Sequence, residues 1–160
     1  MLSWFRHLLR RPVLKRCGGM LTLTDVYCIY NRARGTDLIS PDDLRAAAGE
    51  FMTPTLASLG VVLRVFPSGL VVLQLADFNE EAAAHRIERL FLARATATAT
   101  VTRAEPFLTS IDLATQWNVP LPIAQQLLLA AESRLLICRD ESMSGLRFYL
   151  NRFCGNRAGA

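Results

Sequence analysis

The residues best able to do acid–base chemistry stand in two adjacent acidic pairs. Asp42 is followed by Asp43, and Glu80 is followed by Glu81. Neighbouring residues of a helix point about 100° apart, so neither pair converges easily on one substrate. Both pairs stand where a helix is predicted to begin, and negative charge is favoured there by the helix dipole. The pairs therefore indicate helix starts rather than a catalytic acid and base.

The sequence contains no other pattern for catalysis, metal binding or cofactor binding. Its cysteines lack CxxC spacing and no histidine is placed to complete a zinc site. These residues are Cys17, Cys28, Cys138, Cys154, His7 and His85. GxGxxG, P-loop and GxSxG motifs do not occur. We therefore predict that the protein is not an enzyme, with no catalytic, metal-binding or cofactor-binding residue. Scattered unpaired cysteines favour a reducing compartment such as the cytoplasm.

The basic charge of the chain belongs to its N-terminal segment, residues 1–19. The net charge is +4, but residues 20–160 hold 13 basic residues against 14 acidic ones. A nearly neutral body argues against a protein built around a phosphate backbone. Residues 2–14 have an amphipathic helical pattern that Pro12 is predicted to cut short. We expect this helix to dock on a partner or on the body; the alternatives are weak membrane contact through residues 1–17, or an organelle-targeting peptide.

The next elements predict a first small domain over residues 20–77. Three short helices are predicted, with Thr24, Ser40 and Thr53 as their N-caps. Residues 61–75 then form two β-branched runs around a Pro-Ser-Gly turn, which predicts a hairpin. Three short helices followed by a hairpin are typical of a winged helix.

The same order of elements recurs over residues 78–154, and residues 155–160 form a tail. The Ala/Thr-rich stretch at 95–104 is predicted to be an exposed linker after the first helix, or alternatively an added edge strand. The predicted helices and strands of this domain cover residues 79–94, 109–117, 120–133, 135–139 and 146–150. The fold class is therefore mainly α with small β wings (α+β): two tandem winged-helix domains preceded by an amphipathic N-terminal helix.

Winged helices often bind DNA through their third helix, which needs Arg, Lys, Asn or Gln on its exposed face. In the first domain the predicted third helix, around residues 53–59, has no basic residue. In the second domain, Gln125 and Gln126 could contact bases, but the next basic residue along the chain is Arg134. The phosphate contacts that supply most non-specific affinity are thus missing. We predict protein binding and expect no nucleic acid, with a winged-helix nucleic-acid-binding protein as the alternative.

Several stretches resemble the family of vacuolar protein-sorting-associated protein 36, one of three subunit types of the endosomal sorting complex ESCRT-II. The similarity covers about residues 8–153, and the run over 22–44 is its specific part. The matching stretches are GGMLTLTDVYC at 18–28, NRARG at 31–35, LISPDDL at 38–44, LRVF at 63–66, SG at 68–69, LLLA at 127–130, CRD at 138–140 and GLRFY at 145–149. The family's usual N-terminal domain, which binds phosphoinositide and ubiquitin, is not expected within this sequence, either because the chain is a fragment or because the subunit is reduced, so neither activity is carried over.

The resemblance implies a non-catalytic scaffold subunit of a cytoplasmic complex that is recruited to endosomal membranes. There the complex helps to sort ubiquitinated membrane cargo into multivesicular bodies. Family members pair with a second double-winged-helix subunit, and each binds a copy of a smaller winged-helix subunit. The smaller subunit docks a proline- and aromatic-containing segment on the second winged helix.

The resemblance also implies partner-binding residues in the second domain. An acid after the first wing strand helps the family to hold the docked segment, and Asp140 matches it within the CRD motif. Arg139, Phe148 and Tyr149 are carried over as its neighbours. The alternative for Asp140 is that it only starts a turn, where Asp is favoured. The alternative for Phe148 and Tyr149 is that one of them belongs to the core, because neighbouring residues of a strand point to opposite faces.

In the first domain the partner-binding residues expected from the resemblance are Tyr27, Tyr30 and Arg34. They are expected to face the sister subunit, with packing in the core as the alternative for Tyr27.

Overall fold

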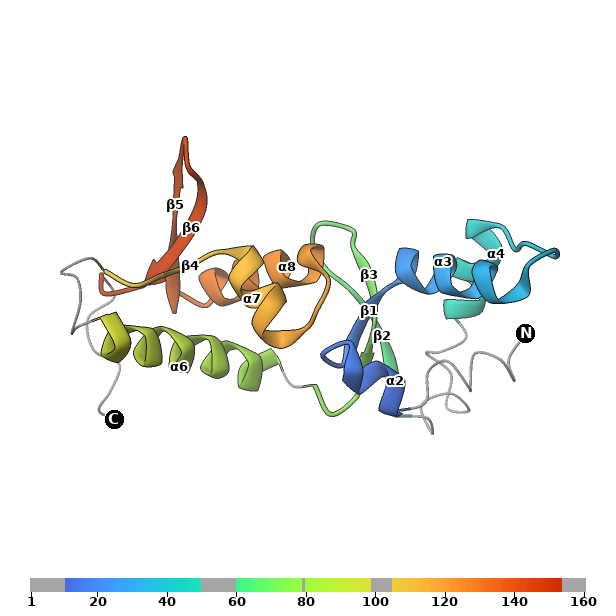
Figure 1. Cartoon of the computed structure of the whole chain (residues 1–160), viewed down its shortest axis with the longest axis horizontal. Coiled ribbons are helices and arrows are strands. Elements are labelled where there is room, and N and C mark those ends of the chain that lie inside the picture. The colour runs from blue at the N-terminus through green and yellow to red at the C-terminus, as the bar shows by residue number, and fades with distance from the viewer. Residues whose placement is uncertain (1–10, 50–59, 79, 99–104, 154–160) are drawn as a thin grey trace. The chain divides into compact units, whose positions relative to one another are not determined.

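The computed structural model of the chain describes residues 11–49, 60–78, 80–98 and 105–153 (Figure 1). Its helices are α2 (Arg11–Arg16), α3 (Leu23–Arg34), α4 (Pro41–Gly49), α6 (Glu80–Thr98), α7 (Ser110–Trp117) and α8 (Leu121–Ser133). Its strands are β1 (Met20–Thr22), β2 (Val61–Val65), β3 (Val71–Leu75), β4 (Phe107–Leu108), β5 (Ile137–Ser142) and β6 (Gly145–Leu150).

The chain divides into two compact units that repeat one order of elements. The first unit holds the residues up to Phe78 with Asn118–Pro120, and the second holds Asn79–Trp117 and the residues from Leu121 onward. Within the described residues each unit runs helix, strand, helix, helix, strand, strand: α2-β1-α3-α4-β2-β3 in the first and α6-β4-α7-α8-β5-β6 in the second. Three helices with a C-terminal hairpin form a winged helix, and the predicted fold class is confirmed.

The first helix of the first unit is α2, which we predicted to lie outside the domain. Leu14 in α2 is fully buried and belongs to the core cluster of this unit, so the unit includes α2 rather than beginning at residue 20. Pro12 lies in the first turn of α2, where its missing N–H leaves no hydrogen bond unmade. Residues 1–10 of the predicted amphipathic helix lie outside the described residues.

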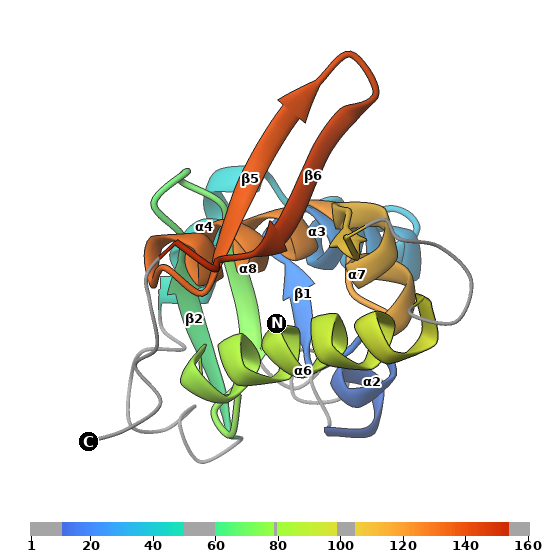
Figure 2. The same cartoon turned by 90° about the vertical axis from the view of Figure 1, so that its left-hand side faces the viewer.

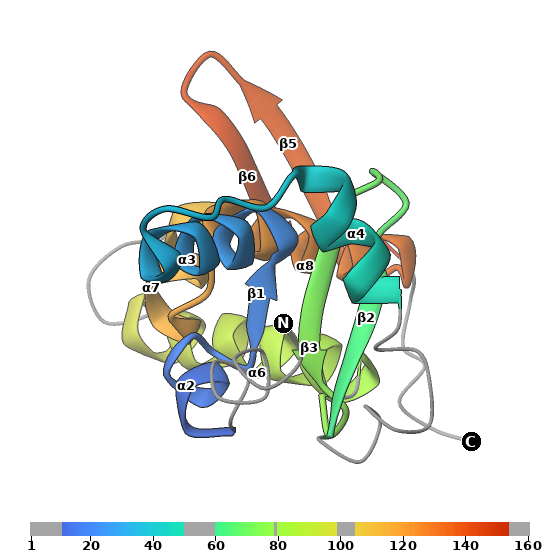
Figure 3. The ribbon, with the colours of Figure 1, turned by 90° about the vertical axis from the view of Figure 1, so that its right-hand side faces the viewer.

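The sheet of the first unit is antiparallel, with β3 between β1 and β2 (Figure 3). Leu73 on β3 stands opposite Leu21 on β1 and Leu63 on β2. The buried core cluster comprises Leu14, Leu21, Val26, Tyr30, Ile39, Leu44, Ala48, Val61, Leu73 and Leu75. The predicted third helix around residues 53–59 lies outside the described residues.

The sheet of the second unit is also antiparallel, with β6 between β4 and β5. Tyr149 on β6 stands opposite Phe107 and Cys138, and Phe148 stands opposite Leu108. Alternate residues of a strand point to opposite faces. Phe148 and Leu108 are both 0% exposed and therefore mark the core face, whereas Tyr149, Phe107 and Cys138 mark the outer face. The β5–β6 hairpin projects beyond α8 (Figure 2).

The core of the second unit is built from apolar side chains of all three helices and of the sheet. Its buried members include Ala83, Ala84, Ile87, Phe91, Leu108, Leu113, Trp117, Ile123, Ala124, Leu127, Leu128, Ala131, Ile137 and Phe148. Helix α8 contributes five of them along one face. Helix α8 is therefore a central part of this core.

Three helices begin with the same pairing of an N-cap hydroxyl and an Asp three residues further on. The backbone N–H of the Asp donates to the hydroxyl in each, joining Asp25 to Thr22, Asp43 to Ser40 and Asp112 to Thr109. Such pairs satisfy backbone groups that have no partner inside the helix. The N-cap of α3 is therefore Thr22 and not Thr24 as predicted, because Thr22 ends β1 with the extended backbone that an N-cap requires.

Two other predicted boundaries differ from the structure. Helix α6 continues to Thr98, so residues 95–98 are helical and not part of a linker; alanine favours a helix enough to outweigh the interleaved threonines. Residues 99–104 lie outside the described residues. Strand β5 continues to Ser142, so Asp140 lies within a strand and does not start a loop. Its pairing with Arg147 on β6 keeps the hairpin regular at this point.

Candidate partner-binding site

A hollow of about 450 Å³ lies where the wing of the second unit joins its body, and we call it the wing groove. Its residues come from the approach to β4, from β5, and from the end of β6 and the residues after it. They are Glu105, Cys138, Arg139, Asp140, Tyr149, Leu150, Arg152 and Phe153. The groove thus combines an aromatic ring and apolar side chains with four charged groups, a mixture that suits recognition of a peptide segment.

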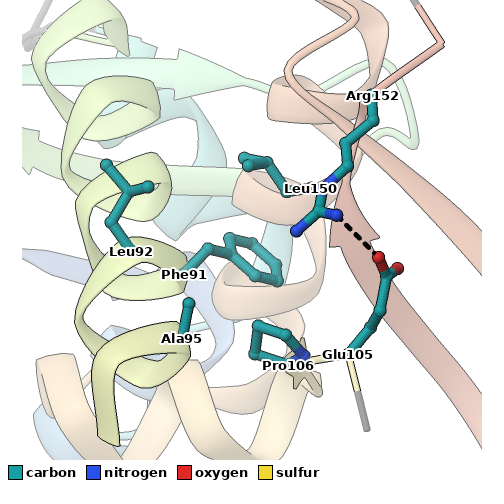
Figure 4. A pocket seen from close by; sticks show the side chains of 7 residues that line it. All are labelled: Phe91, Leu92, Ala95, Glu105, Pro106, Leu150 and Arg152. Atoms are coloured by element: carbon teal, nitrogen blue, oxygen red, sulfur yellow. Dashed lines mark ion pairs between the residues drawn. The ribbon is translucent and has the colours of Figure 1, made fainter. Parts of the chain in front are cut away.

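A second, smaller hollow of about 40 Å³ lies between α6 and the sheet, and we call it the side pocket (Figure 4). Its lining is Phe91, Leu92, Ala95, Glu105, Pro106, Leu150 and Arg152. The ring of Phe91 and the apolar side chains around it leave room for a few water-sized groups at most. Glu105, Leu150 and Arg152 line both hollows, so the side pocket continues the wing groove towards α6.

Aromatic rings form a short row on the outer face of the sheet. The ring centroids of Phe107 and Tyr149 are 6.1 Å apart and the rings are tilted by 48°. The guanidinium carbon of Arg147 lies 4.5 Å from the centroid of the Phe107 ring. Tilted rings at this distance attract one another, and a guanidinium over a ring adds a cation–π interaction.

Of the four charged residues in the wing groove, three are engaged with other protein groups. Glu105 and Arg152 form an ion pair at 2.9 Å, drawn as the dashed line in Figure 4. Arg139 Nε lies 3.3 Å from Glu132 Oε1, and the backbone N–H of Arg139 donates to the same oxygen at 3.2 Å. Asp140 is exposed. Its carboxylate has no ion pair or hydrogen bond with any residue that the structure describes. The groove therefore presents one uncompensated negative charge.

Arg94 on α6 holds β4 in position through the backbone of Phe107. Its guanidinium donates to the carbonyl oxygen of Phe107 and to Asp112 Oδ1, both at 3.0 Å. Thr109 donates to the other oxygen of Asp112 from its N–H at 2.8 Å and from its hydroxyl at 2.7 Å. Burial raises the pKa of Asp112, but the hydrogen bonds from Arg94 and Thr109 outweigh it, so the pKa lies below its ordinary value of 3.8.

The structure brings three of the four residues predicted in the second domain to the groove: Asp140, Arg139 and Tyr149. Phe148 belongs to the core, since it is 0% exposed. Its ring supports the floor of the sheet and is not available to a partner. Arg139 lines the groove, but its guanidinium is turned to Glu132.

In the first unit the three predicted residues have different surroundings. Tyr30 is 2% exposed and lies in the core, while Tyr27 packs half-buried against the same core. Arg34 Nη1 donates to the Tyr30 hydroxyl at 2.9 Å, and Nη2 lies 3.7 Å from Asp37. Arg34 is therefore the exposed end of a contact that reaches into the core, and the ring of Tyr30 is not available to a partner.

Several groove residues were not predicted from the sequence. Cys138 belongs to the CRD motif and stands opposite Tyr149. It lies two residues before Asp140 on the same strand, so the alternation of faces along the strand could have indicated it. Glu105, Arg152 and Phe153 come from irregular segments on either side of the sheet. No spacing rule connects these segments, and only the fold brings Glu105 to Arg152.

The described residues show no grouping suited to metal binding, since no three His, Cys, Asp or Glu side chains come together in them. Both acidic pairs stand in the first turn of a helix, as predicted. Crossing a bilayer needs a longer and more apolar helix than any found in the described parts of the chain.

Helices α4 and α8 are poorly suited to DNA. Helix α4 carries Asp42, Asp43 and Arg45 on its exposed surface, so acids outnumber the single base. Helix α8 contains no Lys or Arg, and Gln125 is its exposed amide. The duplex backbone is strongly negative and is bound mainly by cations. Neither helix has the charge for that contact.

The fold and the wing groove together define a tandem winged-helix protein with a candidate partner-binding groove at its second wing. Sequence comparison then gives its family. The chain belongs to the EAP30/Vps36 family, whose sequence profile matches residues 8–141. The resemblance found in the sequence is thereby confirmed.

Relatives from distant organisms share this region. Vacuolar protein-sorting-associated protein 36 of Drosophila melanogaster is 40% identical over 139 residues, covering 86% of this chain and 30% of the relative. The Homo sapiens protein of that name is 40% identical over 146 residues, covering 91% and 34%. The Dictyostelium discoideum protein is 36% identical over 155 residues, covering 91% and 23%. The chain thus spans about a third of the length of these relatives, or less.

A solved structure has a similar fold. A chain of the "Structure of the ESCRT-II endosomal trafficking complex" matches with a TM-score of 0.54 and 22% identity, covering 86% of this chain and 78% of that chain. At this identity the likeness supports the fold.

Proposed function

We propose that the chain is a non-catalytic scaffold subunit of an ESCRT-II complex. In this role it helps to sort ubiquitinated membrane cargo into multivesicular bodies, through protein–protein contacts of its winged helices. The observation that carries the proposal is the family match over residues 8–141, which covers residues of both units and ends within β5. The complex is cytoplasmic and is recruited to endosomal membranes.

The proposed partners are a second double-winged-helix subunit and a smaller winged-helix subunit. The wing groove is the proposed site for the smaller one, which inserts an extended segment containing proline and aromatic residues. Three features support this choice: the apolar lining, the aromatic Tyr149, and the uncompensated carboxylate of Asp140. Apolar side chains of the segment would pack on the apolar lining of the wing groove, and a basic group fits Asp140.

The contact residues proposed for the second unit are Asp140 and Tyr149, with the stem of Arg139 lining the groove. In the first unit, Arg34 and the exposed edge of Tyr27 are proposed to face the sister subunit. Phe148 and Tyr30 are buried and act indirectly, Phe148 as part of the core beneath the sheet and Tyr30 through its hydroxyl, which accepts a hydrogen bond from Arg34.

The test is co-expression of the chain with the other two subunits and measurement of the mass of the purified complex by light scattering. We expect a defined mass well above that of the 17.8 kDa chain alone. Asp140→Ala should release the smaller subunit while the sister subunit stays bound. Removing a charge-paired contact from an interface costs about tenfold or more in affinity.

Glu141→Ala is the matched control, because Glu141 is the adjacent acid, is exposed, and lies on the opposite face of β5 from Asp140. It should leave the complex unchanged. A chain that remains monomeric with both candidate partners at high concentration contradicts the scaffold function. Equal effects of the two alanine variants contradict the assignment of the groove.

A further inference from the structure

Asp140 stands directly opposite an arginine and yet forms no ion pair with it. The Cα partner of Asp140 across the hairpin is Arg147. Partners in an antiparallel pair lie on the same face of the sheet with their Cβ atoms close together, and opposite charges at such positions normally pair. The absence of an Asp140–Arg147 ion pair within the described hairpin therefore needs a physical cause.

The cause lies on the other side of β6. Phe107 stands opposite Tyr149, and Tyr149 is two residues from Arg147, so Phe107 lies diagonally across from Arg147 on the same face. The Arg147 guanidinium is 4.5 Å from the centroid of the Phe107 ring. That distance is well within the range of a cation–π interaction. Arg147 thus leans towards β4 and away from β5, which carries Asp140.

Phe107 is itself held in place from the body of the unit. Its carbonyl oxygen accepts a hydrogen bond from Arg94 at 3.0 Å, and its ring meets Tyr149 at 6.1 Å between centroids. Phe107 does not line the wing groove or the side pocket. Its influence on the groove therefore acts through the two residues that its ring contacts, Arg147 and Tyr149.

We infer that Phe107 is a positioning residue that holds Arg147 away from Asp140 and so keeps the Asp140 carboxylate available to a basic side chain of the docked segment. The inference rests on the proposed function, since it concerns the same groove. It adds that the Phe107 ring and the Asp140 carboxylate compete for Arg147. Because the ring holds Arg147, the negative charge of Asp140 stays uncompensated.

The test is the affinity of the purified chain for the purified smaller subunit, measured by calorimetry at low and high salt. Phe107→Leu keeps an apolar side chain in β4 but removes the aromatic face, so Arg147 is expected to turn to Asp140. Affinity should then fall by about threefold to fivefold, the range of an exposed ion pair. Its dependence on salt should flatten, since a compensated carboxylate attracts a cation less.

A rescue separates positioning from simple damage to the sheet. Phe107→Leu combined with Arg147→Met should restore both the affinity and its salt dependence, because no arginine remains to neutralise Asp140. Phe107→Trp, which retains an aromatic face, should behave as the unmodified chain does. Circular dichroism of each variant shows whether the fold is intact.

The matched control uses the other arginine beside Asp140. Arg139 is held by Glu132 but lies on the opposite face of β5. Glu132→Gln should therefore change the affinity less than twofold. An equal loss in Glu132→Gln, or a loss in Phe107→Leu that Arg147→Met does not reverse, overturns the inference while leaving the proposed function standing. Failure of the unmodified chain to bind the smaller subunit overturns the proposed function as well.

Discussion

Asp112→Ala should destabilise the second unit, and the size of the effect can be worked out from its contacts. The carboxylate completes the cap of α7 with Thr109, and losing such a cap costs about 1 kcal/mol. It also pairs with Arg94, but the two side chains are 39% and 32% exposed, so solvent reduces that contribution to about 0.5 kcal/mol. We expect a loss of about 1.5 kcal/mol in the free energy of unfolding at pH 7.

Urea unfolding measures this loss if the fluorescence reports the second unit alone. Trp117 is 9% exposed and lies in α7, so its emission changes when this unit unfolds. The other tryptophan, Trp4, is replaced by Phe in every variant. Glu141→Ala is the control for removing an exposed acid of the same unit, and it should change the free energy of unfolding by less than about 0.5 kcal/mol.

The pH dependence gives a second, independent check. Because the folded pKa of Asp112 lies below 3.8, its stabilisation is fully present above the unfolded value and is lost as the pH falls through the folded pKa. The gap between the parent and Asp112→Ala should therefore be constant above about pH 5 and shrink below pH 4. A gap under about 0.5 kcal/mol at pH 7, or one that stays constant down to the lowest pH at which the unit is folded, would refute the reasoning.

Three further substitutions test the fold. Leu135→Gly should stabilise the second unit by about 1 kcal/mol in urea unfolding, because Leu135, two residues after the end of α8, has a φ of 61°, where a side chain is strained. Loss of stability would mean that the half-exposed leucine makes a contact worth more than the strain. Phe148→Ala should cost about 3 to 5 kcal/mol by removing a fully buried ring; a cost below 1 kcal/mol would contradict its place in the core. Gly35→Ala should lower the melting temperature of the first unit, since Gly35 caps α3 at a φ of 77°; an unchanged temperature would argue against that cap.

The sequence was sufficient to predict the elements with strong local signals. The Ser-Pro-Asp-Asp start gave the N-terminus of α4, and the β-branched runs around Pro67 gave the β2–β3 hairpin. Both signals act within a few residues, through capping and through strand propensity. The short strands β1 and β4 were missed because two or three residues have no detectable period, and only pairing with a distant strand defines them.

The site was predictable only where a motif pointed to it. The CRD motif led to Asp140 and Arg139, but their roles depend on tertiary contacts. That Arg139 is engaged by Glu132 and Arg147 by Phe107 follows from the approach of α8 and β4 to the wing. Glu105 and Arg152 meet for the same reason, since they flank the two strands that pair in the sheet. Such side-chain contacts depend on the whole fold and produce no local pattern in the sequence.

The burial gradient along the β5–β6 hairpin has a consequence for its motions. At the base, Ile137 and Phe148 are 1% and 0% exposed, whereas Met143 at the tip is fully exposed. Opening the tip exposes little apolar surface and opening the base exposes much, so backbone amides should exchange with solvent fast beyond Asp140 and slowly below it. Asp140 stands at the boundary between the two regimes. A segment bound in the groove would pack across this boundary and make the opening of the tip less frequent. Slower amide exchange at the wing tip would then indicate binding, although the segment does not contact the tip.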